Sequence, residues 1–125
     1  MSALLALALQ AAAAAPDWQP LGPAPGGMTF YDRAGIVILD AARRRVRIRD
    51  VYHQVRPNGA ASSILSVELD CADRSGLLLE MQELDAAGAV IETWTIAPIR
   101  RRLGPEARGG PEEAQLLRMC GTPRQ

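Results

Sequence analysis

The segment 62–71 constrains the fold most, because it alternates apolar and polar side chains and ends in one of only two cysteines. Its apolar members fall at every second position: Leu65, Val67, Leu69 and Cys71. This period of two is typical of a β-strand with one face in a core and the other in water. We therefore predict a central strand over residues 63–71 whose inner face carries a cysteine.

The composition fits one small globular domain. A chain of 125 residues has room for a single core. The 14 basic residues, all of them arginine, balance 14 acidic residues, so the net charge predicts no general attraction to nucleic acid or membranes. Aromatic residues make up only 4% of the chain. The core is therefore expected to consist mainly of valine, isoleucine and leucine.

Residues 1–15 have the pattern of a secretory signal peptide. An apolar run over residues 3–9 is followed by small residues that end in alanine. The run is too short to span a bilayer, which needs roughly 20 apolar residues. We predict export, with removal of the peptide after Ala13 or Ala14. The alternative is a buried N-terminal helix.

The two cysteines, Cys71 and Cys120, are expected to form an intramolecular disulfide if the chain is exported. The alternative is a pair of metal-binding thiolates with His53. That alternative is weak because the chain lacks the C-x-x-C spacing common in zinc sites. The sequence predicts no metal and no cofactor.

Residues 16–27, rich in proline and glycine around Trp18, are predicted to form an extended leader. A single domain over 28–121 and a tail over 122–125 follow. Turn signals separate predicted strands over 28–31, 46–55, 63–71, 77–84 and 90–96, and a short apolar run lies at 36–39.

Pro111 and two acidic residues favour the start of a helix over 111–119. We expect Ala114, Leu117 and also Leu116 to face inward. The predicted class is α+β: a mainly antiparallel sheet of about five to six short strands with one C-terminal helix and one disulfide.

The chain resembles the surface-adhesin protein E family of exported bacterial proteins over about residues 18–120. Its matching features are Trp18, Phe30-Tyr31-Asp32, Val46-Arg47-Ile48, Ser63 ahead of Leu69-Asp70-Cys71, Ala87-Gly88-Ala89-Val90, Trp94 with Ile96 and Pro98, and Cys120. The resemblance implies an antiparallel β domain with a helix and a Cys–Cys bond. It also implies a relation to adhesins that bind host matrix proteins.

The best candidate ligand site consists of Arg45, Arg47 and Arg49, which an alternating strand places on one face. Three guanidinium groups could bind phosphate or sulfate on lipopolysaccharide or another glycan. Alternatively they form a solvated face, or they pair with carboxylates on neighbouring strands, namely Glu68, Glu80 or Glu92. A second basic cluster lies at residues 100–102.

Catalytic chemistry has weaker support. His53 is the only histidine, and a Ser-His-Asp arrangement would use Ser62, Ser63 or Ser66, but no G-x-S-x-G motif is present. Acid–base or cation chemistry would need a carboxylate pair drawn from Asp70, Asp73, Glu80 and Glu83. Their spacing matches no calcium loop, and turn capping explains Asp73.

We therefore expect an exported, non-enzymatic binding or envelope-associated module, located in the periplasm or at the cell surface. Its expected partner is a protein or an anionic envelope or glycan component, without nucleic acid, and exposed strand edges are compatible with a homodimer. An alternative is a surface adhesin for host matrix proteins. A third hypothesis is a small hydrolase that uses His53.

Overall fold

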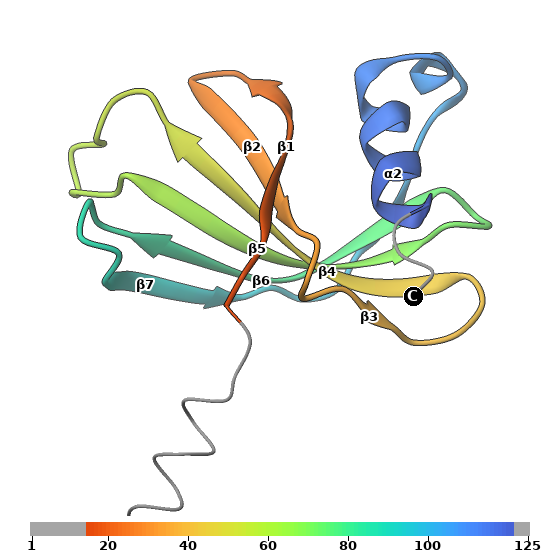
Figure 1. Ribbon diagram of the computed structural model, residues 1–125, viewed down its shortest axis with the longest axis horizontal. Helices are drawn as coiled ribbons and strands as arrows, with labels where there is room; N and C mark the ends of the chain where they lie inside the picture. Colours follow the sequence, from red (N-terminus) through yellow and green to blue (C-terminus); the bar gives the residue numbers. More distant parts are fainter. Residues whose placement is uncertain (1–14, 122–125) are drawn as a thin grey trace, which may run out of the picture.

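The structure is a computed structural model that describes residues 15–121. In this part of the chain, eight strands form one antiparallel sheet and one α-helix follows them (Figure 1). The predicted tail and all of the predicted signal peptide except Ala15 lie outside the described residues. The elements are β1 (Trp18–Ala24), β2 (Gly27–Asp32), β3 (Val37–Ile38), β4 (Arg43–Tyr52), β5 (Ser62–Asp70), β6 (Ser75–Leu84), β7 (Val90–Thr95), β8 (Arg100–Arg102), the 3-10 helix η1 (Pro105–Ala107) and α2 (Pro111–Gly121).

The main path of the sheet follows the order of the chain, β1-β2-β4-β5-β6-β7. Two short strands complete it: β3 pairs with β4, and β8 pairs with β6. The structure thus confirms the α+β class, the antiparallel sheet and the C-terminal helix. It contains more strands than the five to six expected, mainly because β1 and β8 were not predicted as strands.

The segment predicted as an extended leader is extended, but most of it belongs to the sheet. β1 pairs antiparallel with β2 from Trp18, opposite Asp32, to Ala24, opposite Gly27. A register irregularity lies between Pro20 and Gly22. Proline is tolerated there because β1 is an edge strand and one side of its backbone needs no partner.

The strand predicted over 46–55 begins and ends three residues earlier, as β4. The reason for the early start is Asp40, whose Oδ1 accepts the backbone N–H groups of Ala42 at 2.9 Å and Arg43 at 2.8 Å. This cap directs the chain into pairing with β5 from Arg43 onward. At the other end the His53 N–H donates to Gly26 O at 2.8 Å, and the chain then leaves the sheet.

Side chains on one side of the sheet, which we call the helix face, form the core with α2. Val46 is fully buried, and Tyr31 and Leu69 are nearly so. They pack with Leu116 and Met119 of α2. Val67, the neighbour of Leu69 on the inner face of β5, also packs against this cluster, as the period of two predicts.

The predicted inner face of the C-terminal helix is wrong in two of three positions. Leu116 is buried as expected, but Ala114 is exposed and Leu117 is 46% exposed. The inward stripe instead contains Leu116, Met119 and Cys120. These positions share one helix face at spacings of three and four residues, and the bond from Cys120 to Cys71 in the β5–β6 turn holds this face of α2 inward.

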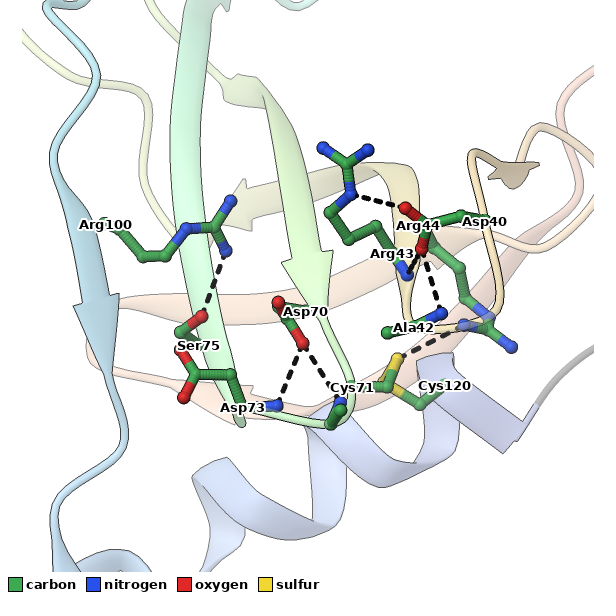
Figure 2. The surroundings of a disulfide bond; sticks show 11 residues. Asp40, Ala42, Arg43, Arg44, Asp70, Cys71, Asp73, Ser75, Arg100 and Cys120 are labelled. Carbon is green, nitrogen blue, oxygen red and sulfur yellow. Dashed lines mark hydrogen bonds and ion pairs between the residues drawn. A yellow bond between two sulfur atoms is a disulfide. The ribbon is translucent and has the colours of Figure 1, made fainter.

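Cys71, just after β5, and Cys120, on α2, form the disulfide that the two cysteines predict, with Cα atoms 5.9 Å apart and a sequence separation of 49 (Figure 2). A guanidinium N–H of Arg44 donates to the Cys71 sulfur at 3.4 Å. Asp70 Oδ1 accepts N–H groups of Ala72 and Asp73 and so closes the β5–β6 turn beside the bond. The disulfide therefore joins the helix to a well-capped turn.

Candidate functional site

Arg45, Arg47 and Arg49 lie on the side of the sheet opposite the helix face. They alternate along β4 with Val46 and Ile48, which pack in the core under α2. We call the opposite side, defined by these three residues, the arginine face. The alternation of β4 thus places the three side chains together, as the sequence predicts.

None of these three arginines forms an ion pair among residues 15–121. Arg45 lies opposite Glu68 in the register between β4 and β5, and Arg47 lies opposite Ser66. Nevertheless Arg45 remains exposed and unpaired in the described part of the chain. Pairing with Glu68, Glu80 or Glu92, one of the alternatives considered above, therefore does not occur in this structure.

The Glu68 carboxylate is occupied by two other arginines. Its Oε2 lies 2.8 Å from Arg100 of β8 and 3.6 Å from Arg43 at the start of β4. Arg100 also donates to the Ser75 hydroxyl at 3.0 Å, as Figure 2 shows. The Glu68 side chain is only 11% exposed. Two cations thus share one carboxylate, and the arginine face keeps a positive balance.

The aromatic ring of Trp18, on β1, packs beside the arginine face. Its ring centroid lies 5.7 Å from the guanidinium carbon of Arg47 and 5.8 Å from that of Arg49. These distances are within the range of cation–π contacts. Arg49 also donates to the Ser62 hydroxyl at 3.5 Å. The ring and the serine hold two guanidinium groups over the sheet without neutralising them.

On this side of the sheet, the methylene groups of the arginine side chains provide the cover that a helix or second sheet would otherwise give. Ile64 and Ser62, which point to the same side, are 8% and 2% exposed although α2 lies on the opposite side. Long arginine side chains can bury their methylene groups on apolar surface while the charge stays in water. The face is therefore apolar at its base and cationic at its surface.

Asp40 and Arg43, at the edge of this face, hold each other in the charged form. A side-chain hydrogen bond from Arg43, followed by backbone hydrogen bonds from Arg43 and Ala42, lowers the pKa of Asp40 below its usual 3.8. The same contact with Asp40 raises the pKa of Arg43, to which Glu68 adds a smaller contribution. Arg43 thus remains a cation beside the three unpaired arginines at any physiological pH.

The residues considered for catalysis are not brought together. His53 is exposed, and within residues 15–121 its imidazole makes no hydrogen bond to Ser62, Ser63 or Ser66. Asp73 pairs with Arg102 at 3.0 Å, and Glu83 accepts from Asn58 at 2.9 Å. The described residues contain no group of three His, Cys, Asp or Glu side chains that could hold a metal.

Two contributors to the arginine face were not predicted as such. Arg100 belongs to the second basic cluster, but nothing in the local pattern shows that β8 returns beside β6 and reaches Glu68. Trp18 was assigned to the leader, and its position over Arg47 follows only from the pairing of β1 with β2. Both positions depend on pairing between strands that a local sequence pattern does not indicate.

Comparisons with models of protein families, with characterised proteins and with solved structures gave no match. The resemblance to the surface-adhesin protein E family therefore stays an expectation from the sequence. Along residues 15–121, no helix has the length and apolar character needed to cross a membrane.

Proposed function

We propose that this chain is an exported, non-enzymatic binding module whose arginine face recognises sulfate or phosphate groups on a glycan. The observation that carries this proposal is the lack of any carboxylate partner for Arg45, Arg47 and Arg49 in the described structure, although Glu68 lies opposite Arg45. Unpaired guanidinium groups on a rigid strand offer planar donors that match the oxygens of such anions.

The geometry supports an extended ligand rather than a single ion. Alternate residues of a strand lie roughly 7 Å apart, so three guanidinium groups form a row along β4. Trp18, whose ring lies against the guanidinium groups of Arg47 and Arg49, adds an aromatic side chain beside this row. A linear chain with repeated anionic groups matches a row of cations better than one isolated phosphate does.

The test is direct binding of a sulfated heparin oligosaccharide, with the desulfated oligosaccharide as a control for charge. Replacing two arginines that have no carboxylate partner among residues 15–121, in the variant R45Q/R47Q, should weaken binding at least about tenfold, because each lost charge-assisted hydrogen bond costs about 1 kcal/mol or more. Added salt should weaken wild-type binding as well.

A charge-matched control is R56Q/R108Q, which removes two exposed arginines away from the arginine face. This control should retain wild-type affinity. Phosphate-bearing lipopolysaccharide, tested in parallel, distinguishes the two anion sources. Equal losses in both double variants, or equal binding of desulfated oligosaccharide, would refute the proposal.

Export is the second part of the proposal and rests on the signal-like residues 1–15 and on the Cys71–Cys120 bond. Intact mass measured on the periplasmic fraction, with and without reduction and alkylation, tests both. We expect a chain that lacks about 13–15 N-terminal residues. Its two thiols should be alkylated only after reduction. A full-length mass with two free thiols would place the protein in the cytoplasm.

A further inference from the structure

A cavity of about 710 Å³ lies on the helix face, away from the arginine face. The sheet forms its floor, α2 forms one wall, and the segment from β8 through η1 to the start of α2 forms another. Its floor and walls include six large apolar side chains: Val67, Leu69, Leu78, Leu103, Leu116 and Met119. Its volume and apolar lining fall in the range of small-molecule sites.

Gly76 creates part of this space. It lies on β6 opposite Leu69 of β5 and opposite Arg101 of β8, where any other residue would place a side chain on the helix face. A Cβ added at Gly76 would meet only Val67 Cγ1 at 3.7 Å and Leu69 Cδ2 at 3.8 Å, which are ordinary contacts. The floor therefore has room for a methyl group at this position.

The mouth of the cavity carries an apolar side chain that the protein itself does not cover. Ile99, in the segment before β8, lines the cavity and is 77% exposed, the highest value among the large hydrophobic residues of the described chain. An aliphatic ligand that enters the cavity would cover this side chain. That burial would add to the hydrophobic free energy of binding.

One cation at this mouth lacks a partner. Arg101 lines the cavity and, among residues 15–121, forms no ion pair, whereas the neighbouring Arg102 binds Asp73 at 3.0 Å. Glu106 and Glu112 line the wall that η1 and α2 contribute. An anionic head group is therefore favoured on the β8 side, beside Arg101, and disfavoured on the α2 side.

We propose that this cavity binds a fatty acid, with the aliphatic chain over Gly76 and under Ile99 and the carboxylate on Arg101. The hydrophobic free energy grows with the apolar area removed from water, so burial of the aliphatic chain supplies most of the affinity. The carboxylate contact with Arg101 supplies orientation. This site is on the opposite side of the sheet from the arginine face and does not depend on the proposed glycan binding.

The test uses dodecanoate below its micelle concentration, measured by calorimetry and by amide chemical shifts of the whole chain. We expect saturable 1:1 binding, with the largest shifts at Gly76, Ile99 and Arg101. Shifts spread over the surface, or centred on β4, would overturn the assignment without any variant. The absence of saturable binding would overturn it as well.

Variants then test separately the pocket for the aliphatic chain of the ligand and the contact with its head group. Gly76→Leu fills the floor and should reduce dodecanoate affinity at least tenfold, and Gly76→Ala should reduce it by less. Arg101→Gln should weaken dodecanoate severalfold but leave dodecanol unchanged, and Arg56→Gln should change neither. Unchanged affinity in a folded Gly76→Leu, or tighter binding of dodecyltrimethylammonium than of dodecanoate, would refute the proposal.

Discussion

At the scale of single residues, Gly27 shows how closely β2 approaches β4. It is buried at the start of β2, opposite Tyr52 in the register. A Cβ at this position would collide with the backbone carbonyl oxygen of Val51 and lie 2.9 Å from its carbonyl carbon. The obstacle is the backbone of the neighbouring strand β4, which cannot move as a flexible side chain would.

We expect Gly27→Ala to lower the free energy of unfolding by about 1–3 kcal/mol, the usual cost of overpacking a well-packed interior. Urea unfolding of the two proteins measures this difference. The matched control is Gly76→Ala, where the added Cβ finds ordinary contacts only and a glycine-to-alanine change in a strand can stabilise by about 0.5 kcal/mol. Equal effects of the two substitutions would contradict the steric argument.

The arginine face shows what can be predicted at this scale. The alternation of Arg45, Arg47 and Arg49 with apolar residues was sufficient to predict their common face. Their lack of carboxylate partners among residues 15–121 was not predictable, because Glu68 binds Arg100, which lies 32 residues away and arrives on a strand that no local pattern indicates. Local periodicity determines which way a side chain points, but distant strands determine which charges it meets.

At the scale of elements, the disulfide determines the orientation of α2. The helix itself was predictable from Pro111 and the acidic residues after it, but its inward face was not. Apolar residues lie on several sides of this short helix, so periodicity alone does not select one. The bond from Cys71 to Cys120 makes the selection, and Leu116 and Met119 follow it into the core.

We expect replacement of both cysteines by serine to reduce the free energy of unfolding by about 4 kcal/mol, the chain-entropy value for a closed loop of this length. Urea unfolding of the oxidised protein and of the double variant measures the loss. Amide hydrogen exchange should rise most in α2, because the helix loses its covalent attachment to the β5–β6 turn.

The variant with both cysteines replaced by serine also serves as a control for the predicted loss of stability. Reductant should destabilise the wild-type protein to the level of the double variant and leave the variant unchanged. A loss below about 1 kcal/mol, or a rise in exchange spread evenly over the sheet, would show that hydrophobic packing alone holds α2 in place.

At the scale of the whole molecule, the two edges of the sheet differ. β1 carries Pro20 and Pro23, which lack the N–H groups that a further strand would need. β7 has no proline and is largely exposed, with Val90 at 53% and Ile91 at 41%. The Ile96 N–H donates to Leu79 O, so alternation turns the backbone groups of Thr93 away from β6.

We expect two copies of the chain to associate through β7, with the strands antiparallel about Thr93. This register pairs threonine with threonine, whereas a register about Glu92 would place two carboxylates opposite each other. Light scattering during size-exclusion chromatography, from micromolar to millimolar concentration, measures the association.

Thr93→Lys should abolish this dimer, because it places like charges opposite each other at the centre of the interface. Val55→Lys is the control, since Val55 is also exposed, at 58%, but lies in the loop after β4. A monomer at every concentration, or equal disruption by both substitutions, would rule out the β7 interface.

The sequential order of the sheet determines how the molecule can assemble. Because the strands of the main path pair in the order of the chain, with only the short β3 between β2 and β4, each pair can close soon after its second strand is available, at a modest cost in loop entropy. α2 comes last, and Cys120 has no partner until the turn at Cys71 has formed. Nearly the whole chain must therefore be available before the wall of the apolar cavity closes, so any partially synthesised chain exposes the helix face to its surroundings.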